Sequence, residues 1–370
     1  MREPGVYSGA LIAQDEVDQW TVHYRLPLET DTSEIGSEEA VYTVLGGLKG
    51  RHEIKIDEIL VRSVWYPNIA VAETWTSPAQ HVFLAGDAAH QNVPTGGYGM
   101  NTGIADAYNL GWKLAARMQY GGAGLLRSYD SERIPVAERV MQHSKAHSLV
   151  HQNISQFFEG IDPHTIDQPT EEGMALRQKI HEHYQKNDGE HKHQGIEMGY
   201  IYESEILQTP KSGSKPVWQE YNYVPSTWPG NRAPHVFLSD GSAIFDHFGK
   251  DWTLVSFIDN IEDCSVRLLL GAANTLRIPV KHVDVSGEHH ARKIWQRDLV
   301  LVRPDEHVAW SADSIQDSTE AQGILEVAVG LRPAENGVET ATTRFGGVST
   351  SVAEIQISTK EHIRESLVKL

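Results

Sequence analysis

The sequence predicts a mixed α/β (α+β) fold, and three patterns in its 370 residues indicate it. Apolar and polar residues alternate over 20–26, which is the period of a half-buried strand. Ile104, Tyr108 and Ala115 recur at the spacing that places apolar side chains on one face of a helix. Beyond residue 250, short apolar runs typical of strands alternate with helical patterns, as in a small α/β unit.

Composition and charge narrow the class of protein. Hydrophobic residues make up 40% of the chain and charged residues 22%, which is typical of a globular protein with a sizeable core. The formal net charge of -18 disfavours binding to nucleic acid or to anionic membrane surfaces. Cys264 is the single cysteine, and the chain has neither a signal-peptide pattern after Met1 nor a run of 18 apolar residues. We therefore expect a cytoplasmic protein.

Residues 1–81 are predicted to form strands around one helix, and residues 82–208 to form a segment with a glycine-rich turn and long helices. A helix begins near Ser37, where acidic residues favour a helix N-terminus, and ends at Gly46-Gly47; strands are expected over 59–61 and 69–72. An apolar run over 82–85 predicts a buried strand that ends at Gly86 and Asp87. After a glycine-rich turn, one helix is predicted to end at Gly121 and another to run from about 125 or 131 to 152. A further helix is predicted over 173–185, and a strand over 197–202.

A linker rich in Pro, Ser and Gly over 209–234 marks the clearest domain boundary. Beyond it, residues 235–330 are predicted to form a small α/β domain. Its elements are strands over 252–258 and 280–285, a helix over 264–276, a hairpin of 299–302 with 308–310, and a helix over 320–329. Residues 331–370 are expected to form a loosely attached tail.

The glycine-rich turn between residues 94 and 101 carries the clearest sign of chemistry. A strand that leads into such a turn and then into a helix can bind an anion, because free backbone N–H groups and the helix dipole favour negative charge. Asp87, at the end of the strand, could accept hydrogen bonds from the hydroxyls of a polyol. Neither GxGxxG nor GxxxxGK[ST] occurs in the chain.

The whole stretch from Gly86 to Ala115 resembles a known motif. It contains Gly86-Asp87-Ala88-Ala89-His90, Pro94, Gly96-Gly97, Gly99-Met100-Asn101, Gly103, Asp106-Ala107, Asn109-Leu110 and Trp112-Lys113-Leu114-Ala115. This string is similar to the second flavin-binding motif of the single-component FAD-dependent aromatic hydroxylases, the p-hydroxybenzoate hydroxylase-like and phenol hydroxylase-like monooxygenases. The resemblance implies FAD as the cofactor, NAD(P)H and O2 as co-substrates, and hydroxylation of a phenolic or other small aromatic substrate.

The resemblance also implies the cofactor-binding residues, which would be Gly86, Asp87, Pro94, Gly96, Gly97, Gly99, Met100 and Asn101. Asp87 would bind the ribityl chain, with Gly86 permitting a close approach, and Pro94 would lie along the isoalloxazine face. The turn would place N–H groups near the pyrimidine ring, where reduced flavin carries negative charge. Helix packing and surface solvation are the expected roles of the side chains of Asp106, Asn109, Trp112 and Lys113.

Two later stretches, 230–235 and 301–310, resemble the borders of the thioredoxin-like C-terminal domain of the phenol hydroxylase-like branch. Redox chemistry in such a domain needs a CxxC motif, and Cys264 is alone. We therefore expect this domain to be structural or to serve as an oligomerisation surface, for example in a homodimer.

The dinucleotide-binding βαβ unit of that family, with its GxGxxG, has no counterpart in the 370 residues, and residues 1–81 resemble only a remnant of its substrate-binding sheet. The sequence is therefore expected to be the C-terminal portion of a hydroxylase, which by itself binds FAD weakly or not at all. Two alternatives stay open. One is a catalytically inactive fragment that acts as a binding or oligomerisation module. The other is a split-enzyme subunit whose partner supplies the N-terminal half.

No catalytic side chain is assigned, and no metal site is expected. The densest group of histidines, His181, His183, His191 and His193, lies in a very polar stretch and is interpreted as a solvated loop. Trp65, Tyr66 and His23 are interpreted as sheet or core residues rather than as residues of a cavity.

Overall fold

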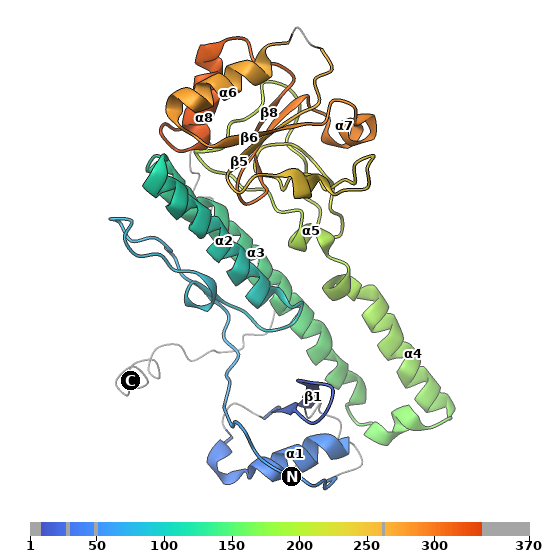
Figure 1. The fold of residues 1–370 in the computed structure, drawn as a ribbon. Coiled ribbons are helices and arrows are strands. Elements are labelled where there is room, and N and C mark those ends of the chain that lie inside the picture. The colour runs from blue at the N-terminus through green and yellow to red at the C-terminus, as the bar shows by residue number, and fades with distance from the viewer. Residues whose placement is uncertain (1–8, 27–29, 48–50, 261–262, 335–370) are drawn as a thin grey trace. The chain divides into compact units, whose positions relative to one another are not determined.

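The structure, a computed structural model, describes residues 9–26, 30–47, 51–260 and 263–334, which belong to one compact unit. It confirms a mixed fold of helices and sheets (Figure 1). Most of the predicted tail, from residue 335 onward, lies outside the described residues. In the part of the chain that is described, no helix combines the length and the apolar character that a bilayer span requires.

The N-terminal part consists of a hairpin and one helix. β1 (Gly9–Ala13) pairs antiparallel with β2 (Trp20–Tyr24), as the alternation over 20–26 predicted. α1 (Ser37–Gly46) has Glu38 and Glu39 in its first turn and is the predicted helix. The prediction of a strand over 59–61 is wrong, because residues 51–69 form no strand. Of the strand predicted over 69–72, only β3 (Ala70–Val71) forms, paired with β4 (His90–Gln91).

Two long helices carry the middle of the chain. α2 (Tyr98–Gln119) and α3 (Gly124–Asn153) lie side by side in Figure 1 and pack against each other. The link between them requires glycine, because a Cβ at Gly122 would lie 2.0 Å from the carbonyl oxygen of Gly330. α4 (Glu171–Lys186) follows and then α5 (Gln194–Glu197), so the three longer helices agree with the predictions.

Two strand predictions in this middle part are wrong. Residues 82–85 form only one isolated bridge, between Thr76 and Phe83. Residues 197–202 begin at the end of α5 and continue as extended chain without a strand. Both stretches are apolar enough for a strand. Val82 and Leu84 make backbone hydrogen bonds with Ser77 and Trp75, but this pairing does not extend into a ladder, and residues 197–202 form no bridge among the described residues.

The C-terminal α/β domain contains a four-stranded sheet in the order β6-β5-β7-β8. β5 (Trp252–Ser256) is parallel to β6 (Val280–Asp284) and antiparallel to β7 (Leu299–Val302), which pairs antiparallel with β8 (Val308–Ala312). α6 (Ser265–Leu276), α7 (His289–Trp295) and α8 (Ser318–Ala328) complete the domain. This order and these directions are those of a thioredoxin-like sheet, and only α7 was missed by the sequence prediction.

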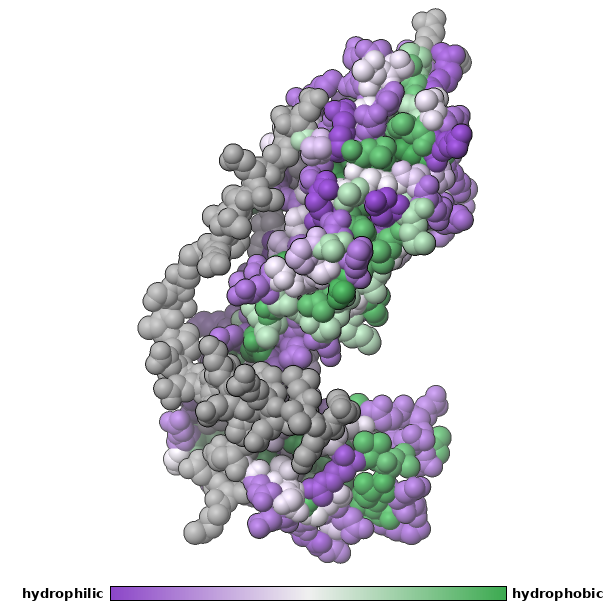
Figure 2. Space-filling view, turned by 90° about the vertical axis from the view of Figure 1, so that its left-hand side faces the viewer, coloured by the Kyte–Doolittle hydropathy of each residue, from purple (hydrophilic) through white to green (hydrophobic). Residues whose placement is uncertain are grey.

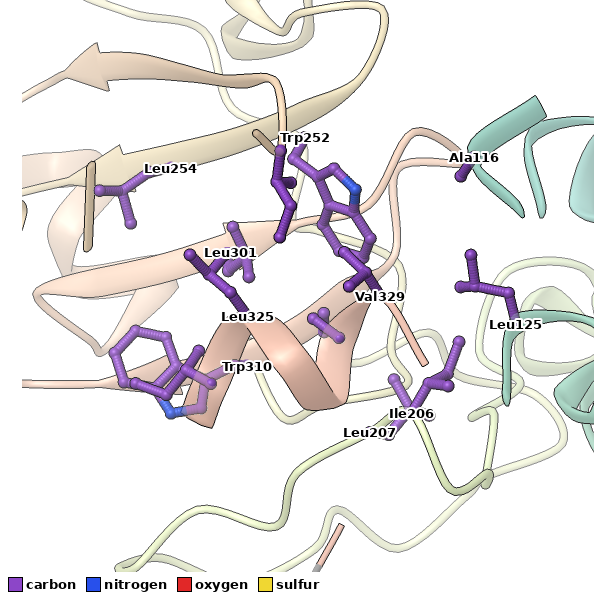
Figure 3. Close-up of a cluster of buried hydrophobic side chains, with 14 of the residues drawn as sticks. Ala116, Leu125, Ile206, Leu207, Trp252, Leu254, Leu301, Trp310, Leu325 and Val329 are labelled. Atoms are coloured by element: carbon purple, nitrogen blue, oxygen red, sulfur yellow. The ribbon is translucent and has the colours of Figure 1, made fainter. Parts of the chain in front are cut away.

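Both faces of this sheet are buried at its central strands β5 and β7, whose side chains are all buried, whereas the edge strand β6 is largely exposed. Trp252, Leu254 and Leu301 belong to one core, which also contains residues of α6 and α8. Val255 and Val300, on the opposite face, pack with residues of α7. Figure 3 shows that the first core continues to Ala116 of α2 and Leu125 of α3. The two long helices and the sheet therefore share one hydrophobic core.

Short 3-10 helices connect several of these elements: η1 (Thr32–Glu34), η3 (Gly86–Ala88), η4 (Ile154–Phe158), η5 (Pro163–Asp167), η6 (Asp188–His191) and η7 (Ile244–His247). The stretch predicted as a linker, 209–234, forms no helix or strand. Thr227, Asn231 and Ala233 of this stretch are nevertheless buried.

Candidate functional site

The glycine turn (residues 94–101) lies directly before and within the first turn of α2. Gly96 and Gly97 have φ angles of 84° and 69°, in the left-handed region that favours glycine. Of the eight predicted cofactor-binding residues, Asp87, Pro94, Gly97, Met100 and Asn101 are exposed, and Gly86, Gly96 and Gly99 are half-buried. The turn is therefore open to a ligand and is not covered by side chains of the described residues.

The N-terminus of α2 is uncapped. The N-cap residue is Gly97, which has no side chain that could accept a hydrogen bond from the first N–H groups of the helix. The first turn of the helix contains no acidic residue. The amide of Asn101 instead donates to the carbonyl oxygen of Gly97, 2.9 Å away. Free N–H groups and the helix dipole make this end of α2 a favourable place for negative charge.

Helix α3 and Glu190 hold the turn in place. The Thr95 hydroxyl donates to the carbonyl oxygen of Ser144, at 2.5 Å, and the N–H of Gly96 donates to Glu190, at 2.8 Å. Burial raises the pKa of Glu190, but hydrogen bonds from His151 and from the Gly96 N–H outweigh it, so the pKa lies below its ordinary value. Glu190 is thus a carboxylate that already occupies one N–H group of the turn.

Asp106 fixes the position of the Gly86 turn from inside. Its Oδ2 accepts from the Gly86 N–H at 3.1 Å and lies 2.7 Å from Nε2 of His90, while Oδ1 accepts from Nε of Arg133 at 2.7 Å. Burial raises the pKa of Asp106, but the His90 hydrogen bond and the Arg133 charge hold it below its ordinary value. The Asp106 carboxylate, on α2, therefore connects the Gly86 turn, β4 and α3.

A four-charge cluster of Lys113, Glu132, Arg303 and Asp305 joins α2 and α3 to the C-terminal α/β domain. Glu132 accepts from Nζ of Lys113 at 2.7 Å and from both Nη atoms of Arg303 at 2.8 Å. Nη2 of Arg303 also donates to Asp305 at 2.6 Å. All four side chains are buried. Two of these side chains are positively charged and two are negatively charged, so the buried cluster carries little net charge.

The protonation of this cluster follows from burial and from the partners. Burial lowers the pKa of Lys113 to about 8, although the adjacent Glu132 carboxylate favours the charged form. Burial raises the pKa of Glu132, but the charges of Arg303 and Lys113 hold it well below its ordinary range.

The expectation for the side chains of α2 was therefore only partly correct. Asp106, Asn109 and Trp112 pack inside, as expected, but surface solvation is wrong for Lys113, which is fully buried. Asn109 and Trp112 donate to Asp305 at 3.2 and 2.9 Å. Helical spacing alone could not reveal these contacts, because the acceptor lies almost 200 residues further along the chain.

The glycine turn offers a matched pair of substitutions. A Cβ at Gly96 would lie 2.3 Å from the ring of Tyr98 at a left-handed φ, whereas a Cβ at Gly99 would meet its nearest atom at 3.5 Å. We expect Gly96→Ala to lower the free energy of unfolding by about 1–3 kcal/mol. Gly99→Ala, which improves helix propensity without a clash, should not lower it. Urea unfolding of both variants measures the difference, and equal destabilisation would contradict the geometry of the turn.

The histidines differ from the solvated loop that was expected. Residues 171–186 form α4, and His193 is only 5% exposed. His193 is buried because the chain folds back there onto His143 and His147 of α3, whose rings lie 5.5 and 5.2 Å away between centroids. A cavity of about 360 Å³ lies next to this group and is lined partly by His147, His151 and Glu190.

Sequence reasoning missed His143 and His147, although their four-residue spacing within a predicted helix was a readable signal. Burial lowers the pKa of both imidazoles. Burial and the nearby carboxylates of Glu197, Glu190 and Glu220 raise the pKa of Tyr98, the first residue of α2, to about 12.

The structure also places Trp65, Tyr66 and Cys264, three residues considered in the sequence analysis. Trp65 and Tyr66 are 64% and 55% exposed, so they are neither core residues nor part of a cavity among the described residues. Cys264 is exposed and directly precedes α6.

Comparisons with known proteins match both the segment that contains the glycine turn and the C-terminal α/β domain. A family profile described as FAD binding domain matches residues 3–144, and one described as Aromatic-ring hydroxylase, C-terminal, matches residues 226–331. The FAD-dependent monooxygenase apdD of Emericella nidulans is 44% identical over 333 residues, covering 88% of this chain and 53% of the relative. The FAD-dependent monooxygenase opdD of Penicillium oxalicum is 46% identical over 326 residues, covering 87% and 62%.

Among solved structures, the flavin-dependent monooxygenase PieE in complex with FAD and substrate matches with a TM-score of 0.71 at 26% identity. That match covers 88% of this chain and 59% of the other. The fold is thus that of a flavoprotein class. The chain belongs to the FAD-dependent aromatic-ring hydroxylases. It spans about half the length of the curated relatives it matches.

Proposed function

We propose that this chain supplies the isoalloxazine-binding turn and the C-terminal α/β domain of an FAD-dependent monooxygenase. The reaction would be the hydroxylation of a phenolic or other aromatic substrate with NAD(P)H and O2. The observation that carries the proposal is the exposed, uncapped N-terminus of α2, which follows two left-handed glycines. The names of the relatives, which include FAD-dependent monooxygenases and a phenol 2-monooxygenase, support the type of reaction.

The residues present fit one half of FAD. Asp87 is exposed beside the Gly86 turn and can accept hydrogen bonds from the ribityl hydroxyls. Pro94 is exposed and can lie along the ring, and the N–H groups at the start of α2 stabilise negative charge at the pyrimidine edge. The bound cofactor would supply the electron transfer from NAD(P)H and the activation of O2, while this chain orients it.

The other half of FAD has no binding motif in these 370 residues, since GxGxxG does not occur. We propose that a GxGxxG unit, on the same or a separate polypeptide, packs against the chain. The exposed face of α2 is suited to this contact: Met100, Ile104, Tyr108 and Met118 are 74%, 60%, 51% and 86% exposed. Apolar surface of this kind is open on the face that Figure 2 shows, and such patches mark contact surfaces.

The test is FAD titration of the purified 370-residue chain, alone and after mixing with the part of the relative apdD that this chain does not match. We expect weak binding or none for the chain alone, because the pyrophosphate and adenosine contacts are lost. The mixture should retain flavin and oxidise NAD(P)H when a phenol is added. Asp87→Asn should weaken FAD binding by the mixture about tenfold, the loss of one charge-assisted hydrogen bond.

The matched control is Glu138→Gln, which neutralises an exposed carboxylate on α3. It should leave flavin affinity unchanged. Stoichiometric flavin in the isolated chain would refute the weak binding that we expect. A mixture that binds flavin equally with Asp87 and with Asn at this position would refute the role of Asp87.

A further inference from the structure

The three rings of the histidine cluster, His143, His147 and His193, converge from two separate segments. His143 and His147 lie four residues apart on α3 and therefore share one face of the helix. His193 lies between η6 and α5. One nitrogen from each ring can be chosen so that all three lie within 4.8 Å of one another.

Glu220, from the loop after α5, completes a set of four ligand groups. Its Oε1 is 3.4 Å from Nδ1 of His143 and 3.0 Å from Nε2 of His193. Four ligands at about 2.0–2.1 Å from one tetrahedral ion lie about 3.3–3.4 Å apart. The two distances to Glu220 are thus close to those of neighbouring ligands. The ring nitrogens, which lie within 4.8 Å of one another, would have to approach by up to about 1.4 Å on binding the ion.

The imidazole of His193 lacks the hydrogen bonds that a buried ring normally makes. Its Nδ1 is buried without a hydrogen-bond partner among the described residues, and its Nε2 has only the 3.0 Å contact with Glu220, which does not have the geometry of a hydrogen bond. Tyr221 packs edge-on against its ring at 4.3 Å. An unsatisfied buried polar group destabilises the folded state, so a ligand that pairs with these nitrogens would stabilise the fold.

We propose that His143, His147, His193 and Glu220 bind one Zn²⁺ ion. Three imidazoles and one carboxylate suit Zn²⁺, whereas Ca²⁺ and Mg²⁺ take oxygen ligands. With four protein ligands the site is closed, and its role is structural. The ion ties α3 to the chain around residues 193 and 220. The Tyr98 hydroxyl lies 3.2 Å from Nε2 of His147, so the same tie supports the first residue of α2.

The test measures metal directly and needs no flavin, so it is independent of the proposed monooxygenase function. The 370-residue chain is purified, stripped with a chelator and dialysed against Zn²⁺, and its metal content is determined by mass spectrometry. We expect one Zn²⁺ per chain and a higher melting temperature with Zn²⁺ than without it. Co²⁺ in place of Zn²⁺ should give the visible absorption of a tetrahedral site.

Variants distinguish these ligands from other histidines. His193→Gln should lower Zn²⁺ affinity at least 100-fold, whereas His191→Gln, two residues away and exposed, should leave it unchanged. Glu220 is partly exposed, so Glu220→Gln keeps the fold and should lower affinity about 10–100-fold even if His193→Gln does not fold. A folded wild-type chain that retains no Zn²⁺, or equal affinity for the wild-type and the Glu220→Gln chains, would overturn the proposal.

Discussion

Glu132→Gln is expected to lower the free energy of unfolding by about 3–5 kcal/mol, because it breaks a buried ion cluster from one side. Oε2 of Glu132 accepts from Lys113 at 2.7 Å and from Arg303 at 2.8 Å, and Oε1 accepts from Arg303 and, at 2.7 Å, from Ser204. In glutamine, one of these two oxygen atoms is replaced by an NH2 group. This group would point at the N–H or O–H donors that the oxygen accepts from in the wild-type protein. The substitution would also leave two buried cations with Asp305 as their only carboxylate in the four-charge cluster.

Urea unfolding followed by circular dichroism measures this effect. Glu138→Gln on the same helix is the control, since Glu138 is exposed, and it should change the free energy of unfolding by about 0.5 kcal/mol at most. Because the cluster joins α3 to the C-terminal α/β domain, the transition of the variant should also become broader or split in two. A loss below about 1 kcal/mol would mean that the cluster contributes little to stability.

Asp106→Asn is expected to cost about 3 kcal/mol of stability and to release the Gly86 turn. The Asp106 carboxylate accepts hydrogen bonds from the Gly86 N–H and from Arg133 at 3.1 and 2.7 Å. The NH2 group of an asparagine at this position would point at one of these two donors. The buried Arg133 would also lose its negatively charged partner. Thermal unfolding measures the loss.

Asp87→Asn is the control for this change, because Asp87 lies in the same turn but is exposed. It should leave the melting temperature within error while reducing flavin affinity in the reconstituted mixture. If Asp106→Asn had the same small effect on unfolding as Asp87→Asn, the buried carboxylate would not be what holds the turn.

Local patterns predicted most of the helices. The N-terminal signals at Ser37 and the apolar spacing after residue 104 correspond to α1 and α2 because a helix makes its hydrogen bonds within its own segment. Strands depend on partners elsewhere in the chain. Residues 252–256 and 299–302 found them in each other, whereas 82–85 and 197–202 did not, although all four stretches are apolar.

The candidate site was predictable where it is contiguous and hidden where it is not. The glycine turn occupies eight consecutive positions, so its resemblance to a flavin motif could be read directly. The partners that position it come from far along the chain: Glu190 is 94 residues from Gly96, and Arg303 is 171 residues from Glu132. The histidine cluster was missed for the same reason, since His193 meets α3 only after the chain folds back.

The four-charge cluster anchors α2 in the C-terminal half of the helix. Gly97 at its tip and Trp112, which donates to Asp305, are separated by about 22 Å at 1.5 Å per residue. A rotation of α2 by about 3° about Trp112 would therefore move Gly97 by about 1 Å. A displacement of this size strongly affects the rate of a reaction that depends on alignment. A change in the positions of Arg303 and Asp305 is thus expected to be transmitted along α2 to the glycine turn at its other end.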